Sequence, residues 1–289
     1  MHPYSPHAVA ELLREHGIRP AKRLGQNFLW DRNVLERIVR VAGVSEDDPV
    51  LEIGPGLGSL TRVLADHARA VTAVEVDRGL RPVLDALADE RPNVRVIYAD
   101  ALRLDWDGLL DEAFGGKTGA IVANIPYAIT TPLVERVLSV KRRLRRATLL
   151  VQLEVAERLA APPNCKAYGS LSVFVQYHMQ VEKGGVVART VFVRQPDVAS
   201  ALVVMTPALP SSVPVQDEAT FFRVVRAGFG QRRKTLANAL DALEGANRTG
   251  VLAALASAGI DPMRRAETLS LREFAALADA IAAADAARG

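Results

Sequence analysis

The chain has 289 residues, of which 49% are hydrophobic and 24% charged, with a formal net charge of +3; this length suits one large domain and a smaller one. A single cysteine, Cys165, excludes a disulfide framework and a thiolate metal site, and the five His residues lack metal-ligand spacing, so no metal is expected. No apolar segment has the length of a signal-peptide core or a membrane span, which predicts a cytoplasmic protein without membrane contact.

From about residue 34 the sequence alternates short apolar segments with helical ones. Strands are expected at 50–53, 71–75, 94–99, 120–123 and 148–153, with a first helix at 60–65. Apolar strands separated by helices indicate a Rossmann-like, doubly wound, mainly parallel α/β sheet. A closing strand at 200–205 is expected to be antiparallel, and a Ser- and Pro-containing break at 211–214 precedes a helical region. In that region, Ser270 and Glu273 form a plausible capping box.

Three strand ends carry groups suited to one ligand. Closely spaced glycines, beginning with Gly54, join the first strand to the first helix, where the backbone can pass close to a ligand. Their GxGxG spacing lacks the third glycine of the dinucleotide fingerprint. Glu75 ends the second strand, where a carboxylate can bind both ribose hydroxyls. Asp100 follows the third, where it can accept a hydrogen bond from an adenine amino group.

The fourth strand ends in Asn124-Ile125-Pro126-Tyr127, which favours methylation of a poorly nucleophilic amine. The exocyclic amine of adenine delocalises its lone pair into the ring, and the Asn124 oxygen and a neighbouring backbone carbonyl can accept both of its protons. Tyr127 can then stack against the base. An ordinary turn is the alternative for four residues alone. Because carboxyl ends of parallel strands share one edge of a sheet, we expect all four strand ends to meet in one crevice.

Together, these motifs resemble the ribosomal RNA adenine dimethyltransferase family, and its bacterial small-subunit branch above all. The resemblance runs from about residue 20 to the carboxyl end and rests on the segments 25–29, 51–61, 75–77, 100–102, 124–127 and 229–236. It implies S-adenosylmethionine as methyl donor, with S-adenosylhomocysteine as product. It also implies contacts to the donor from Asn27, Leu29, Gly54, Glu75 and Asp100, with Asn124 between the donor and the target amine.

The same resemblance implies a substrate and a division of the chain. The substrate would be two adjacent adenosines near the 3′ end of 16S rRNA, dimethylated in the immature small ribosomal subunit. Residues 1–208 would bind the donor, with 1–33 closing over it, and 209–289 would form a helical RNA-binding domain. We expect a monomer, since no dimerisation heptad is evident.

Two positions depart from the family pattern around the loop for the target base. Arg194 stands where the family has the first proline of a Pro-x-Pro stretch, and Ala199 replaces a polar residue. Phe192 remains available to sandwich the base against Tyr127, with a plain core role as the alternative. These departures leave the rigidity of the loop open.

Three basic clusters predict a nucleic-acid surface. They lie at 141–146, which includes Arg142 and Arg143; at 231–234, which includes Arg232, Arg233 and Lys234; and at Arg19, Lys22 and Arg23. Three alternatives to the small-subunit activity stay open: a 23S rRNA dimethyltransferase of the antibiotic-resistance type, a DNA adenine methyltransferase, and a non-catalytic ribosome assembly factor.

Overall fold

A computed structural model describes residues 3–21, 24–231, 233–241, 243 and 247–286. The chain divides into two compact units, one of residues 1–156 and 182–207, the other of residues 157–181 and 208–289. The second boundary lies next to the one expected at 208/209, whereas residues 157–181 join the helical unit, which the sequence did not indicate. Among the described residues, no helix has the length and apolar character that crossing a membrane requires.

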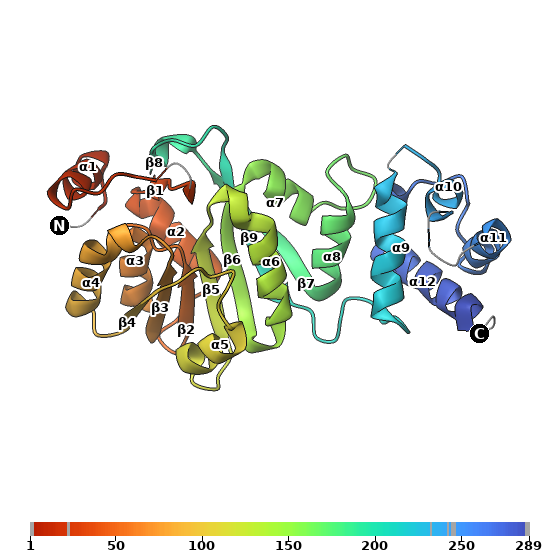
Figure 1. Cartoon of the computed structure of the whole chain (residues 1–289), viewed down its shortest axis with the longest axis horizontal. Coiled ribbons are helices and arrows are strands. Elements are labelled where there is room, and N and C mark those ends of the chain that lie inside the picture. Colours follow the sequence, from red (N-terminus) through yellow and green to blue (C-terminus); the bar gives the residue numbers. More distant parts are fainter. Residues whose placement is uncertain (1–2, 22–23, 232, 242, 244–246, 287–289) are drawn as a thin grey trace. The chain divides into compact units, whose positions relative to one another are not determined.

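The described residues form nine strands. They are β1 (Phe28–Leu29), β2 (Pro49–Ile53), β3 (Ala70–Glu75), β4 (Val94–Tyr98), β5 (Gly119–Asn124), β6 (Leu144–Gln152), β7 (Met179–Val187), β8 (Phe192–Val193) and β9 (Ser200–Pro207) in the described chain. Seven of them form one sheet in the order β4-β3-β2-β5-β6-β9-β7 (Figure 1). The strands from β4 to β6 are parallel, and β9 runs antiparallel to β6, as predicted.

The helices follow the strands in the alternating order that the sequence predicts. They are α1 (Pro6–Glu15), α2 (Arg32–Ala42), α3 (Ser59–His67), α4 (Arg81–Glu90), α5 (Trp106–Phe114), α6 (Thr130–Ser139), α7 (Leu153–Leu159), α8 (Ser170–His178), α9 (Glu218–Gly230), α10 (Leu236–Leu240), α11 (Arg248–Ser257) and α12 (Leu271–Ala286). Short 3₁₀ turns are η2 (Arg78–Leu80), η3 (Tyr127–Ile129), η4 (Lys141–Arg143), η5 (Arg189–Val191) and η6 (Ala266–Thr268).

The order of the strands explains where a ligand can bind. From β2 the chain moves outward to β3 and β4, then returns to β5 on the other side of β2. Because such crossovers are right-handed, this reversal places α3 and α4 on one face of the sheet and α5 and α6 on the other. Open sheets bind ligands at this reversal, outside the carboxyl ends of the strands. The crevice therefore lies beyond the ends of β2 and β5.

Continuous apolar side chains hold the first unit together. All five residues of β2 are buried, and Val50 packs with Val71 and Ala120 from the neighbouring strands against α2 and α3. Buried parallel strands of this kind read as unbroken hydrophobic runs, which is why the sequence located them correctly. The strand β6 is the exception, since it begins at Leu144, four residues before the predicted start at 148.

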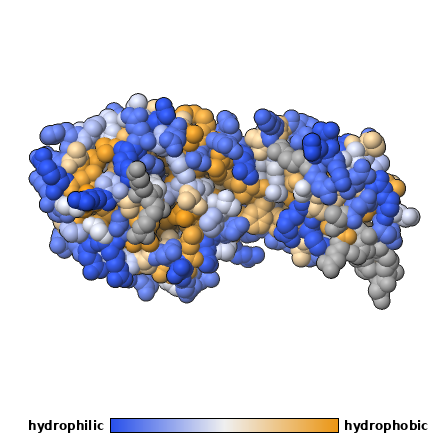
Figure 2. All heavy atoms as spheres, turned by 45° about the horizontal axis from the view of Figure 1, so that its top comes forward, coloured by the Kyte–Doolittle hydropathy of each residue, from blue (hydrophilic) through white to orange (hydrophobic). Residues whose placement is uncertain are grey.

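The second unit has its own core, formed by α8 to α12. Aromatic side chains dominate it: Tyr177 lies 4.8 Å from Phe221 between ring centroids, and Phe229 lies 5.7 Å from Phe274. The predicted capping box opens α12, where Ser270 N–H donates to the Glu273 carboxylate at 2.8 Å and Glu273 N–H donates to Ser270 Oγ at 3.3 Å. Hydrophilic residues cover most of the face shown in Figure 2.

Candidate active site

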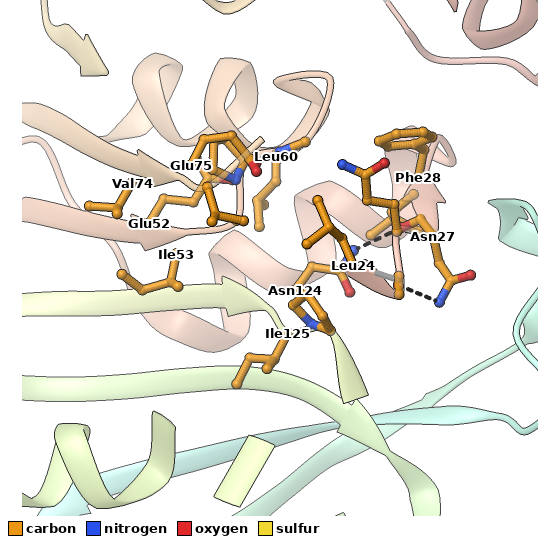
Figure 3. A pocket seen from close by; sticks show the side chains of 18 of the residues that line it. Leu24, Asn27, Phe28, Glu52, Ile53, Leu60, Val74, Glu75, Asn124 and Ile125 are labelled. Carbon is orange, nitrogen blue, oxygen red and sulfur yellow. Dashed lines mark hydrogen bonds between the residues drawn. The ribbon is translucent and has the colours of Figure 1, made fainter. Parts of the chain in front are cut away.

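All eight residues predicted to bind the donor or the target base line one cavity at the crevice. They are Asn27, Leu29, Gly54, Glu75, Asp100, Asn124, Tyr127 and Phe192. The cavity encloses about 1000 Å³, including the part open to solvent, and apolar side chains such as Leu60 and Ile125 form much of its wall (Figure 3). Few polar groups in a largely apolar cavity are typical of a ligand site.

The turn after β2 approaches the cavity with its backbone. Gly56 has φ of +59° and Gly58 of +76°, in the left-handed region that residues with a Cβ rarely adopt. A Cβ on Gly58 would lie 2.6 Å from Leu87 Cδ2, so a larger residue would also have to displace this side chain. The turn leads into the amino end of α3, which places backbone N–H groups at the cavity.

Glu75, at the end of β3, is held in place by the backbone around it. Its Oε2 accepts the Gly56 N–H at 3.1 Å, and its Oε1 accepts the Asp77 N–H at 2.8 Å. The side chain is only 5% exposed, and burial raises its pKa. Each carboxylate oxygen has a second lone pair, so both can still accept hydroxyl donors from a ligand in the cavity.

Asp100 follows β4 and is less enclosed. Its Oδ1 accepts the Leu102 N–H at 2.9 Å, and its Oδ2 lies 3.5 Å from Nε of Arg103. The carboxylate therefore has a fixed direction while it lines the cavity. Glu75 ends β3 and Asp100 follows β4, so the two carboxylates lie at the carboxyl ends of adjacent strands.

Glu52 is a member of the site to which sequence reasoning gave no role. It lies in the middle of the apolar strand β2, is 1% exposed, and lines the cavity beside Glu75 (Figure 3). Burial raises its pKa to about 8, and the negative charge of Glu75 adds to the rise. A carboxyl inside a buried hydrophobic strand was the signal that could have identified it.

The side chain of Asn124 is anchored at one end. Its Nδ2 donates to the backbone carbonyl of Asn27 at 3.3 Å (Figure 3). The remaining polar atom of this side chain is the acceptor oxygen Oδ1. Asn27 belongs to a segment that we call the N-terminal arm, comprising residues 20, 21 and 24–30. At Gly25 the arm lies against Pro126, where an added Cβ would be 3.5 Å from the proline Cβ.

Two aromatic residues line the same cavity as Asn124. The phenol oxygen of Tyr127 lies 2.9 Å from Ser200 Oγ, which fixes the tyrosine ring, and burial raises the pKa of Tyr127. Phe192 lines the cavity but is 4% exposed, and it packs in the core near Leu29, with which it pairs in the β1–β8 ladder. Stacking by Phe192 on a base therefore requires the base to reach into this corner of the cavity.

The basic run 141–146 is largely engaged within the protein. Arg143 pairs with Asp111 at 2.6 Å, Arg145 with Asp48 at 2.8 Å, and Arg146 donates to the Val41 carbonyl at 3.2 Å. Arg142 is exposed. This run precedes or opens β6, which is parallel to β5, so it lies at the amino ends of the strands. Six residues of β6, 147–152, separate the end of this run from the carboxyl edge, or about 20 Å.

The basic cluster at 231–234 follows α9 in the second unit. Arg233 and Lys234 are exposed, while Arg232 lies outside the described residues, as do Lys22 and Arg23. Among the described residues, no three His, Cys, Asp or Glu side chains are grouped so that they could hold a metal ion.

A mainly parallel seven-stranded sheet with a cavity at its reversal point defines the class I methyltransferase fold. A family model described as ribosomal RNA adenine dimethylase matches residues 18–283. The chain belongs to the ribosomal RNA adenine dimethylase family.

Two curated relatives illustrate the similarity, and both are named ribosomal RNA small subunit methyltransferase A. The protein of Pelotomaculum thermopropionicum is 48% identical over 282 residues, covering 95% of this chain and 96% of the relative. That of Moorella thermoacetica is 45% identical over 278 residues, covering 94% and 96%.

Two solved structures share the fold at lower identity. The 23S rRNA methyltransferase ErmE is 29% identical with a TM-score of 0.68, covering 89% of this chain and 100% of that one. A dimethyladenosine transferase from Plasmodium falciparum is 26% identical with a TM-score of 0.73, covering 86% and 95%.

Proposed function

We propose that the protein transfers methyl groups from S-adenosylmethionine to the exocyclic amines of two adjacent adenosines of 16S rRNA, in the immature small subunit in the cytoplasm. The observation that carries this proposal is the anchored amide of Asn124, which lines the same cavity as Glu75 and Asp100. The identity of 48% to a small-subunit methyltransferase, against 29% to the 23S enzyme ErmE, supports the small subunit as substrate.

The residues present fit the methyl donor. Glu75 would hold the ribose hydroxyls, Asp100 the adenine amine, and the turn at Gly54 would pass along the methionine part. Asn27 and Leu29 of the N-terminal arm would close the cavity from the other side. When bound, S-adenosylmethionine supplies a methyl group that its positive sulfur has already activated.

The protein's own contribution is to bring the adenine amine to that methyl group. A base inside stacked RNA is out of reach, so it must be turned out of the stack into the cavity. Asn124 Oδ1 and the Ile125 carbonyl would accept the two amine protons and direct the nitrogen lone pair, while Tyr127 and Phe192 would hold the ring. Orientation then supplies most of the rate acceleration. Water can remove the proton from the product ammonium, which is acidic.

Contact with RNA outside the cavity is proposed for the basic residues. Arg233 and Lys234, together with Arg232, would bind phosphates, and Arg142 and Arg143 would do so if the RNA extends to the amino edge of the sheet. The protein would act as a monomer and without a metal, because the chemistry described needs neither a second chain nor a metal ion.

The variant Asn124→Ala tests this function. Transfer of labelled methyl groups to immature small subunits should nearly stop, while RNA affinity stays unchanged, since the amide orients the amine without gripping phosphates. The matched control is Asn93→Ala, because Asn93 precedes β4 at the opposite edge and binds the carbonyls of Ala65 and Ala68. Full activity of Asn124→Ala would overturn the assignment, and preferred methylation of large subunits by the wild type would favour the 23S alternative.

A further inference from the structure

The segment 189–197 carries Phe192, and we call it the loop of Phe192. It is joined to the N-terminal arm by more than the β1–β8 pairing. In that pairing Leu29 faces Phe192 and Phe28 faces Val193. Trp30 N–H extends it by donating to the Val191 carbonyl at 3.1 Å. Arg194 is the first residue beyond the ladder. Its side chain makes a further bond to the arm.

Arg194 has an unusual backbone and a specific partner. Its φ is +60°, in a region that residues with a Cβ rarely occupy and that surrounding structure must stabilise. Its guanidinium Nη1 donates to the backbone carbonyl of Pro20 at 2.9 Å, although the two residues lie 174 positions apart. The half-buried side chain therefore ties the loop of Phe192 to the start of the arm.

The arm continues from this tie to the donor side of the cavity. Next to Pro20, the Ala21 N–H donates to Gln26 Oε1 at 2.8 Å. The same amide of Gln26 donates through Nε2 to Asp77 Oδ2 at 2.7 Å. The Asp77 N–H in turn donates to Glu75 Oε1 at 2.8 Å. A chain of hydrogen bonds thus runs from the loop of Phe192 to the carboxylate at the end of β3.

The same arm holds the amide at the centre of the site. The Asn27 carbonyl, one residue after Gln26, accepts the Nδ2 of Asn124 (Figure 3). Three walls of the cavity therefore depend on where the arm lies: the Glu75 side, the Asn124 amide, and the loop with Phe192. Of the three, only the last is tied to the arm through an arginine that departs from the family pattern.

We propose that Arg194 is a positioning residue for methyl transfer. By binding Pro20 it sets the N-terminal arm against the loop of Phe192, and so fixes the acceptor side of the cavity relative to Asn124 and the donor side. The proposal rests on the proposed function, because it concerns the geometry of that same reaction.

The first experiment compares Arg194→Ala with Arg189→Ala in the full-length protein. Arg189 lies in the same loop, carries the same charge, and also donates to a backbone carbonyl, that of Asp197 at 2.9 Å, but this bond stays within the loop. Loss of a phosphate contact or of general loop order would affect both variants. For Arg194→Ala we expect kcat to fall about 10- to 100-fold, because a small misplacement of reacting groups is enough for such a loss. The KM for RNA and the donor Kd should change little, and Arg189→Ala should keep the wild-type kcat.

Two further substitutions separate the side chain from the backbone turn. Arg194→Gly accepts φ of +60° without strain but lacks the tie, so it should be as slow as Arg194→Ala. Arg194→Lys retains a charged donor for one carbonyl and should recover much of the rate. A double-mutant cycle that combines Arg194→Ala with Gln26→Ala tests the chain of hydrogen bonds. The fold loss of kcat in the double variant should be smaller than the product of the two single losses, because both residues act through the arm.

The outcomes distinguish this inference from the function on which it rests. A wild-type protein that transfers no methyl group to small subunits contradicts the proposed function itself. An active wild type with equal kcat in Arg194→Ala and Arg189→Ala overturns the positioning role alone. A wild-type kcat in Arg194→Gly would also overturn the positioning role, because it would assign the effect to the backbone. The same holds if the melting temperature of Arg194→Ala falls in proportion to the lost activity.

Discussion

The phenol oxygen of Tyr127 lies 2.9 Å from the hydroxyl of Ser200, and this contact joins η3, the turn after β5, to the start of β9. The tyrosine ring thereby stands in one orientation in the wall of the cavity. The contact separates two properties of Tyr127, its hydrogen bond and its aromatic face, which different substitutions remove.

Tyr127→Phe should lower the free energy of unfolding by about 1 kcal/mol, the usual net contribution of one hydrogen bond, and should leave most of the transfer rate. Tyr127→Ala should lose far more activity, because base stacking on an aromatic side chain contributes about 1–3 kcal/mol. Urea unfolding and single-turnover methylation measure the two effects. Equal rates in the two variants would show that the ring does not contact the base.

Glu75→Gln should weaken binding of S-adenosylmethionine about 10- to 100-fold, as expected for hydrogen bonds to a charged acceptor of about 1.5–3 kcal/mol. The amide would also face two backbone N–H groups with only one oxygen. Calorimetric titration measures the affinity. Glu112→Gln is the control, since Glu112 is an exposed partner of Arg95, and an unchanged affinity in Glu75→Gln would remove the ribose assignment.

Glu52 should make stability depend on pH. Its pKa is raised from 4.5 to about 8, so the folded protein keeps a proton that the unfolded chain releases near pH 4.5. Its contribution to stability is therefore fully present below about pH 4.5 and is lost as pH rises to about 8. The difference in unfolding free energy between the wild type and Glu52→Gln should decline from pH 5 to pH 8 and then level off. Parallel stability curves for the two proteins would contradict a protonated Glu52.

Gly58→Ala should destabilise the protein by about 1–3 kcal/mol, because both backbone strain and overlap with Leu87 oppose a Cβ. Gly116→Ala is a matched control with nearly the same φ, +78°, and open space around the added carbon. The difference between the two midpoints in urea isolates the steric part. Equal losses would mean that Leu87 moves aside without cost.

The double variant Arg233→Ala, Lys234→Ala should reduce the salt dependence of RNA binding, with the slope of log K against log salt falling by about 1.5 if both residues contact phosphates. Arg143→Ala should change the slope less, because the charge of Arg143 is paired with Asp111 at the amino edge of the sheet. An equal reduction in Arg143→Ala would show that RNA reaches that edge.

The sequence predicted the sheet well because buried parallel strands have an unbroken apolar pattern that few other elements share. It placed the start of β6 too late, because Arg145 and Arg146 look like a solvated basic run until their partners, Asp48 and the Val41 carbonyl, are known. The local sequence pattern does not reveal which distant residue a charged side chain will bind in the folded protein.

The same limit applies to the site. The residues at the strand ends were found because parallel topology brings them together whatever the loops do. The Gln26–Asp77 bond and the Arg194–Pro20 bond were not found, because each joins residues far apart in sequence. Glu52 was missed although its place inside an apolar strand was a local signal. Gln26 and Asp77 were present in recognised motifs, but nothing in the motifs indicated that they contact each other.

The ladder between β1 and β8 has a consequence for biosynthesis. The strands β1 and β8 lie near opposite ends of the sequence of the first unit and are therefore synthesised at different times. A nascent chain can assemble β2 to β5 long before β8 leaves the ribosome. Until then Glu75 and Asn124 face solvent without Phe192 beside them. The enzyme completes its reaction chamber late in its own translation, and a product truncated before residue 192 would lack both Phe192 and β9, the strand between β6 and β7.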